Sequence, residues 1–245
     1  MPKRSPAKTT TKESRDTIAD QVDAVVAELK RLATKHTLDG MSRYGIPSEK
    51  AFGVSVGDIQ RLAKRLGRNH ELAAALWKTG WYEARMLTAY LDEPERVTPA
   101  QMDRWCRDFD SWAICDTICF CLFDRTPHAW DKAPEWAKSP REFVKRTGFV
   151  LMACLAAHDK AATDAQFLML LPLIVEGAND ERNFVKKGVS WALRMIGRRN
   201  AALNAAALPV ARRLAESEVA ACRWVGKDAL RELASPKVQS RLARK

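Results

Sequence analysis

A segment that recurs at intervals of about 40 residues constrains the fold of this chain more than any other feature. Phe143-Val-Lys-Arg aligns with Phe184-Val-Lys-Lys at an offset of 184 − 143 = 41 residues, and a third copy begins at Ala221. Each copy opens with one or two basic residues and then continues with apolar residues at helical spacing. A helix pair of this length is typical of HEAT repeats, which stack into a solenoid. The sequence therefore predicts an all-α, right-handed α-solenoid of HEAT-like helix-pair repeats.

The same helical spacing extends through almost the whole chain. It begins in the segment 18–32, whose apolar residues recur at i, i+3 and i+4, and it ends near Leu233. Thr98-Pro99 and Ser139-Pro140 read as helix starts, with the hydroxyl as N-cap and Pro at the first helical position. We predict a disordered basic tail over residues 1–15 and a single repeat domain over residues 16–240.

The charge of the chain favours an anionic partner. Its 41 Lys and Arg against 30 Asp and Glu give a net charge of +11, of which residues 1–15 contribute 5 − 1 = +4. The remaining 11 − 4 = +7 belongs to the repeats, where a basic concave face would suit the phosphate backbone of duplex nucleic acid. The cations predicted to lie on successive repeats, here called the cationic strip, are Lys145, Arg146, Lys186, Lys187 and Arg223.

Other patterns argue against membrane, secreted and metal-binding classes. The longest nearly apolar run, Phe167–Val175, is far shorter than the ~20 residues of a membrane helix, and no secretory signal opens the chain. The six Cys residues include no CxxC pair, so we expect reduced, mostly buried thiols and no metal. We expect a monomeric bacterial protein of the cytoplasm, associated with the nucleoid when bound to DNA.

Two segments that contain tryptophan provide the candidate catalytic and binding residues. Trp112 and Asp116 are i, i+4 neighbours on an otherwise apolar helix. Burial of a carboxylate there is costly unless it is paired with another group or has a functional role. An Asp salt-bridged to a neighbouring helix, with Trp112 in the core, is the alternative interpretation. In the second segment Trp191 lies close to Lys187 and Arg194 on one helix face. Two indoles and a carboxylate would attract a cationic group carried on nucleic acid.

The chain resembles the DNA alkylation-repair glycosylases of the AlkD type over roughly residues 40 to 235. The resemblance rests on four segments: Phe52-Gly-Val-Ser-Val-Gly-Asp-Ile, Ser111-Trp-Ala-Ile-Cys-Asp, Phe143-Val-Lys-Arg and Arg182-Asn-Phe-Val-Lys-Lys-Gly-Val-Ser-Trp-Ala-Leu-Arg. The chain differs from the family pattern in its extended basic N-terminus and in its residues at His158-Asp-Lys and Arg182–Lys187.

This resemblance implies a HEAT-like solenoid that excises positively charged N3- and N7-alkylpurines from duplex DNA, without a metal or organic cofactor. It implies catalytic roles for Trp112, Asp116 and Trp191. It also implies a phosphate contact for Arg146, a further DNA contact for Arg194, and an aromatic contact for Tyr44. Lys145 and Lys187 are the DNA-binding candidates of the cationic strip.

The chemistry that this implies needs no general acid, because an N-alkylated purine is already a cationic leaving group. Asp116 would stabilise the sugar cation that develops as the glycosidic bond breaks, and it could position or deprotonate water. Excision would then start base excision repair without a base-reading pocket. The alternatives are a non-catalytic HEAT-repeat protein that binds damaged or branched DNA, and a protein-binding scaffold.

Overall fold

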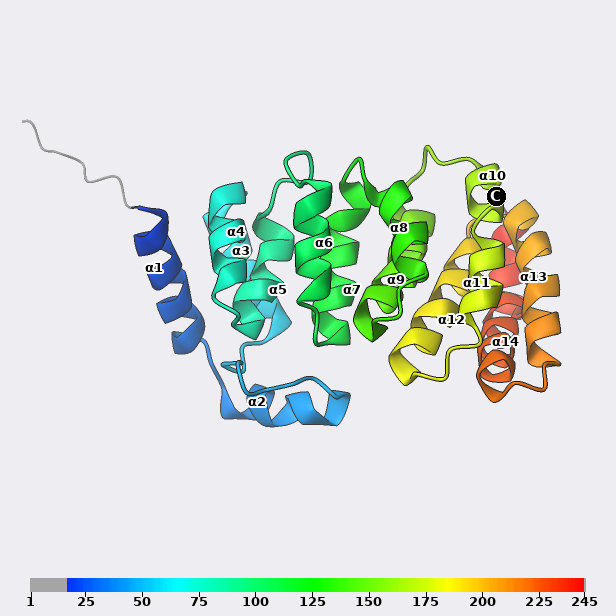
Figure 1. The fold of residues 1–245 in the computed structure, drawn as a ribbon, viewed down its shortest axis with the longest axis horizontal. Coiled ribbons are helices and arrows are strands. Elements are labelled where there is room, and N and C mark those ends of the chain that lie inside the picture. Colours follow the sequence, from blue (N-terminus) through cyan, green and yellow to red (C-terminus); the bar gives the residue numbers. More distant parts are fainter. Residues whose placement is uncertain (1–16, 245) are drawn as a thin grey trace, which may run out of the picture.

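The computed structural model describes residues 17–244, and every regular element among them is a helix (Figure 1). The basic tail predicted for residues 1–15 lies outside the described residues. The elements are α1 (Ile18–Arg31), α2 (Lys35–Met41), η1 (Ser42–Tyr44), α3 (Val56–Leu66), α4 (His70–Lys78), α5 (Tyr82–Leu91), α6 (Pro99–Arg107), α7 (Trp112–Cys121), η2 (Phe123–Arg125), α8 (Ala129–Ala137), α9 (Glu142–His158), α10 (Asp164–Leu168), α11 (Leu171–Gly177), α12 (Asn183–Gly197), α13 (Ala201–Ala215), α14 (Ala220–Leu233) and α15 (Pro236–Leu242).

The helices stand side by side in one continuous array, with α2 crossing beneath its N-terminal half (Figure 1). Within a pair, α4 packs on α5, α8 on α9, and α13 on α14. Between pairs, the second helices form a layer in which α5 contacts α7, α7 contacts α9, α9 contacts α12, and α12 contacts α14. This is the stacking of HEAT-like helix pairs, so the predicted fold class is confirmed.

Local sequence signals explain where several helices begin. Thr98 accepts a hydrogen bond from the Gln101 amide with Pro99 at the first position of α6, as predicted. The predicted start at Ser139-Pro140 is wrong, because α9 begins only at Glu142. The Ser139 hydroxyl instead accepts from the Arg141 amide at 3.2 Å, in the turn between α8 and α9.

The core runs the length of the array rather than forming one centre. Phe123, Phe149 and Phe167 are fully buried, and Trp77 stacks on Trp105 with ring centroids 4.2 Å apart. All six cysteines are free thiols, and five of them are buried among these apolar side chains. No helix in the part of the chain that the structure describes is long and apolar enough to cross a membrane.

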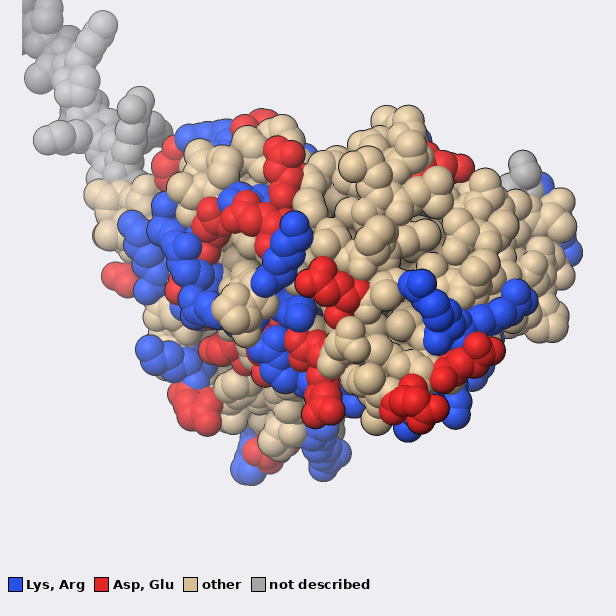
Figure 2. Space-filling model, turned by 45° about the vertical axis from the view of Figure 1, so that its right-hand side comes forward, with Lys and Arg blue, Asp and Glu red and all other residues tan. Residues whose placement is uncertain are grey.

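Basic and acidic side chains are intermixed on the surface. In Figure 2, Lys and Arg lie beside Asp and Glu over the N-terminal half, and much of the upper right is uncharged. Two cations of the cationic strip, Lys145 and Arg146, form ion pairs, which are described below with the site. A uniformly basic concave face therefore stays a prediction.

Candidate active site

A pocket of about 530 Å³ lies where three of the second helices begin. Trp112 is the first residue of α7 and Asn183 the first of α12, while Arg146 lies in the second turn of α9. The N-terminal ends of α7 and α12 have a positive partial charge, which lies in this pocket together with the negative charge of Asp116. Its lining consists of Arg43, Tyr44, Gly45, Trp112, Asp116, Arg146, Asn183, Phe184 and Lys187.

Asp116 and Arg146 form a two-point ion pair at the base of this pocket. Arg146 Nε donates to Asp116 Oδ1 at 2.9 Å, and Nη2 donates to Oδ2 at 2.7 Å. The third nitrogen of the guanidinium, Nη1, donates to the Phe184 carbonyl at 2.6 Å. The pair joins α7 to α9, and the hydrogen bond to Phe184 extends it to α12. The carboxylate that seemed isolated in the sequence thus has a partner, as the salt-bridge alternative anticipated, and it also faces a pocket.

The burial of this pair differs between its two members. The Arg146 side chain is 6% exposed, whereas that of Asp116 is 19% exposed. Burial raises the pKa of Asp116 above its ordinary value, and the neighbouring guanidinium works in the opposite direction. The Arg146 side chain is held by Asp116 and the Phe184 carbonyl while it borders the pocket, and the phosphate contact expected for it from the sequence stays a prediction.

A hydrogen bond from Trp112 connects α7 to Tyr44 at the rim of the pocket. The indole Nε1 donates to the Tyr44 carbonyl at 2.8 Å, across 68 residues of sequence. Gly45 follows in a left-handed conformation, with φ at 65°, and ends η1. The Tyr44 side chain is 67% exposed at this rim, so it is free to meet a ligand.

Trp191 and Arg194 line an adjoining pocket of about 290 Å³. Arg146 and Lys187 border both pockets and so join the two tryptophans into one surface. Arg194 itself is paired with α14, because its Nη1 lies 2.6 Å from Glu232 Oε2 and its Nε lies 3.5 Å from Asp228 Oδ2. The structure thus brings Tyr44, Trp112, Asp116, Arg146 and Lys187 to one pocket, with Trp191 and Arg194 next to it.

The remaining cations of the cationic strip are largely engaged. Lys145 Nζ lies 3.1 Å from Asp180 Oδ2, and it borders neither pocket. The Arg223 guanidinium donates to the Ser217 carbonyl at 2.7 Å, and the Lys186 ammonium lies 5.4 Å from the centroid of the Trp224 ring. Lys187 is exposed, and its side-chain ammonium forms no ion pair or hydrogen bond with residues 17–244.

Sequence reasoning missed a second Trp-x-x-x-Asp segment. Trp224 and Asp228 lie one turn apart on α14 and line the pocket that contains Trp191. Asp228 also accepts a hydrogen bond from the Ser190 hydroxyl at 2.6 Å. The spacing shared with Trp112 and Asp116 was the signal that could have identified this pair.

The arrangement provides a carboxylate, two indole faces and an unpaired lysine around one surface. Together these groups can stabilise a cation at Asp116 while Lys187 contacts an anion. Among residues 17–244, no group of three or more His, Cys, Asp and Glu side chains is placed to hold a metal ion.

The chain is similar to several known proteins. Over 134 residues it is 26% identical to an uncharacterized protein of Listeria innocua serovar 6a and 25% identical to one of Listeria monocytogenes serovar 1/2a. These matches cover 53% of this chain and 58% of each relative, which is less than two thirds of their length.

A solved structure has the same fold, with a TM-score of 0.72 at 21% identity, covering 86% of this chain and 95% of that one. It is described as representing a new family of proteins related to the HEAT-like repeat DNA glycosylases, with affinity for branched DNA structures. The family model for the DNA alkylation repair enzyme matches residues 25–233. This match spans the helices that build both pockets, and the chain belongs to the DNA alkylation repair enzyme family.

Proposed function

We propose that this protein is a DNA glycosylase that hydrolyses the N-glycosidic bond of positively charged N3- and N7-alkylpurines in duplex DNA. The observation that carries the proposal is the Asp116 carboxylate, which Arg146 holds by two hydrogen bonds at the base of a pocket bordered by Trp112. Membership of a DNA alkylation repair family supports the substrate class.

In the proposed reaction, bond cleavage places positive charge on the deoxyribose, and the fixed carboxylate of Asp116 stabilises that charge. The leaving purine departs as a neutral base because it began as a cation, so no acid is required. Water then adds to the sugar carbon, and Asp116 accepts a hydrogen bond from that water or takes its proton. Trp112 and Trp191 contribute cation–π attraction, which is worth about 0.5–2 kcal/mol for each contact.

Binding of the DNA backbone is assigned to groups that the fold leaves available. Lys187 has an unpaired ammonium and lines the same pocket as Asp116, and the helix N-termini at Trp112 and Asn183 provide amide dipoles for a phosphate. Arg146 is assigned a positioning role, because its hydrogen bonds fix the orientation of Asp116. Tyr44 stands at the rim, where it can contact the sugar or base.

The test is release of free base from duplex DNA that contains 7-methylguanine or 3-methyladenine. Matched duplexes with uracil or 8-oxoguanine are the comparison, because these bases are neutral and leave as anions unless they are protonated. We expect release of the charged bases alone. Efficient release of uracil would contradict the mechanism, since it requires a base-reading pocket with a group that protonates or stabilises the departing anion, and the proposal includes neither.

A second candidate function is binding of branched DNA without excision. It is favoured by the likeness in fold to the solved structure described as having affinity for branched DNA. The same base-release assay separates the two candidates when it is run beside binding measurements on a four-way junction and on linear duplex. Junction affinity without release of any alkylated base would support this candidate and exclude the glycosylase.

A further inference from the structure

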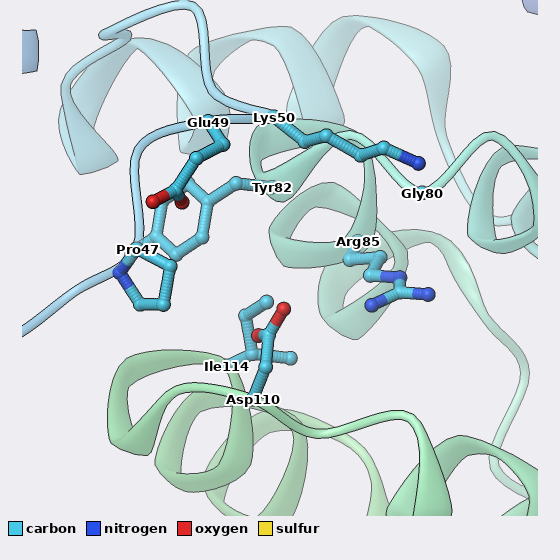
Figure 3. Close-up of a pocket in the computed structure, with 8 residues that line it drawn as sticks. All are labelled: Pro47, Glu49, Lys50, Gly80, Tyr82, Arg85, Asp110 and Ile114. Atoms are coloured by element: carbon cyan, nitrogen blue, oxygen red, sulfur yellow. The ribbon is translucent and has the colours of Figure 1, made fainter.

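A third pocket, of about 390 Å³, lies on the other side of the first turn of α7 (Figure 3). Asp110 and Ile114 border it, whereas Trp112 and Asp116 border the candidate active site. The segment at and after η1 contributes to both, since Tyr44 and Gly45 line the candidate active site and Pro47, Glu49 and Lys50 line this third pocket. A polymer lying in one pocket therefore passes close to the other.

The charged groups of this pocket are not paired with one another. The side chains of Lys50, Glu49 and Asp110 all line it, and none of these side chains forms an ion pair or hydrogen bond with residues 17–244, although the Lys50 backbone carbonyl accepts from the Tyr82 amide at 2.8 Å. In the view of Figure 3, the Lys50 ammonium and the Arg85 guanidinium lie toward one end, and Glu49 lies toward the other. Because these four charged side chains do not pair with one another, their charges are available to a bound molecule.

Arg85 is held in place but keeps unused donors. Its side chain is 16% exposed, and its guanidinium lies 5.0 Å from the centroid of the Trp77 ring. Nη1 donates to the Asp108 carbonyl at 3.2 Å, Nη2 lies 3.9 Å from the Asp108 carboxylate, and the buried Nε has no hydrogen-bond partner in residues 17–244. Because Nε is buried, an anion would meet the terminal nitrogens Nη1 and Nη2, and their remaining N–H groups make the fixed guanidinium preorganised for it.

The occupant must combine three chemical features. Arg85 and Lys50 require an anionic group, whereas Glu49 and Asp110 would repel a bare phosphate and instead require hydrogen-bond donors. The ring of Tyr82 and the side chain of Ile114 provide apolar surface between them. A nucleotide supplies all three, through its phosphate, the amino group of its base and the flat face of that base. The volume also falls within the range of about 300–1,000 Å³ of small-molecule pockets.

We propose that this pocket, here called the nucleotide pocket, binds one unpaired nucleotide of a DNA strand whose duplex portion lies at the active site. The proposal rests on DNA being the substrate, as set out above. The nucleotide must be unpaired and unstacked from its neighbours, because the face of its base that contacts Tyr82 is covered by the adjacent base pairs inside a duplex. The phosphate lies between Lys50 and Arg85, and the base stacks against Tyr82.

The experiment compares affinity for a blunt undamaged duplex with affinity for the same duplex carrying a short single-stranded overhang of cytidines or thymidines. We expect roughly tenfold tighter binding of the cytidine overhang than of the blunt duplex, as stacking of one base provides. The thymidine overhang should bind less tightly, since thymine has an O4 acceptor where cytosine has an N4 amino donor. Lys50→Ala should remove most of the preference for an overhang, and Asp110→Asn should reduce the difference between the two overhangs.

Lys237→Ala, at an exposed lysine of α15 that borders neither pocket, is the matched control and should leave the preference unchanged. Thermal unfolding of each variant confirms that it is folded. The proposal is overturned if Lys50→Ala weakens binding to the blunt duplex and the overhang equally, or changes neither. Base release by the wild-type protein from a blunt alkylated duplex is measured separately. If no base is released but the preference for an overhang is intact, the glycosylase proposal alone is contradicted. If base release is normal but there is no preference for an overhang, the nucleotide pocket alone is contradicted.

Discussion

Because the Asp116–Arg146 pair is largely buried, the charge of each residue is compensated mainly by the other. A buried ion pair gains little net stability over apolar side chains of similar volume, yet removal of one partner leaves an uncompensated charge. Two parallel hydrogen bonds also fix the plane of the Asp116 carboxylate relative to the pocket. At the scale of single residues, this pair thus confers geometry on the site more than stability on the fold.

Asp116→Asn tests the electrostatic role of the carboxylate. The amide keeps the size of the side chain but loses its charge, so stabilisation of the sugar cation is lost. We expect release of 7-methylguanine to slow by roughly 10²–10³, while affinity for undamaged duplex stays close to that of the wild type. Single-turnover base release and fluorescence anisotropy provide the two measurements. A folded Asp116→Asn protein with wild-type release would return Asp116 to a purely structural role.

The pH dependence of base release follows from the same carboxylate. Burial raises the pKa of Asp116, so protonation begins at a higher pH than for an exposed aspartate of pKa about 3.9. Because the ionised form is the active one, the rate should be constant near neutrality and fall as the pH drops through that raised pKa. The profile is measured in single-turnover reactions after subtraction of the enzyme-free depurination rate. A profile that stays flat to the acid limit of folding would show that ionised Asp116 is not required.

At the scale of helices, the two helices of a pair pack with their backbones close together. Gly148 lies in α9 where a Cβ atom would come within 2.3 Å of the Ala137 amide nitrogen on α8. Gly226 repeats the arrangement in α14, where a Cβ would come within 2.1 Å of the Ala215 nitrogen on α13. In both pairs the backbones touch because the second helix has a glycine at the crossing point.

Gly148→Ala should therefore destabilise the protein even though alanine is the better helix former. The added methyl group must push α8 and α9 apart, and overpacking of this kind costs about 1–3 kcal/mol of unfolding free energy. Gly40→Ala in α2 is the matched control, since nothing lies within 4 Å of its added Cβ, and it should stabilise by up to about 1 kcal/mol. Urea unfolding measures both. Equal effects of the two substitutions would contradict the close approach at Gly148.

The sequence was informative where the signal is local. The helical spacing and the Thr98-Pro99 start are local patterns, and the 41-residue offset (184 − 143 = 41) is visible because the same local pattern recurs; the structure contains the helices that each of them predicts. The partner of Asp116 could not be predicted, because Arg146 lies 30 residues away and meets it only when α7 packs on α9. The Ser139-Pro140 motif misled for a related reason, since a hydroxyl followed by proline also suits the turn that ends the preceding helix.

At the scale of the whole molecule, much of the positive charge is balanced within the fold. Lys145 is paired with Asp180, and Arg194 is paired with Glu232, so these side chains contribute less to an external field than a count of residues suggests. Lys187 keeps an unpaired ammonium beside the active site. DNA binding should consequently depend on a few unpaired cations rather than on the full net charge of +11.

Lys187→Ala should lower affinity for any duplex sequence and flatten the dependence of log affinity on log salt concentration by about 0.9, the value for one phosphate contact. Lys145→Ala is the matched comparison on the neighbouring helix, and we expect a smaller change in slope because Asp180 already neutralises that lysine. Affinities at several salt concentrations give both slopes. A slope for Lys187→Ala equal to that of the wild type would place Lys187 away from the phosphates.

The hydrogen bond from the Trp112 indole to the Tyr44 carbonyl has a consequence for how this chain can vary in length. Repeat arrays generally tolerate the gain or loss of a unit, because each unit contacts only its neighbours. Here the hydrogen bond spans the segment 44–112, so a helix pair inserted or deleted within it would move η1 away from the start of α7 and open the rim of the pocket. Helix pairs added after α15 would leave that rim intact. Natural insertions and deletions that preserve activity should therefore fall outside the segment 44–112.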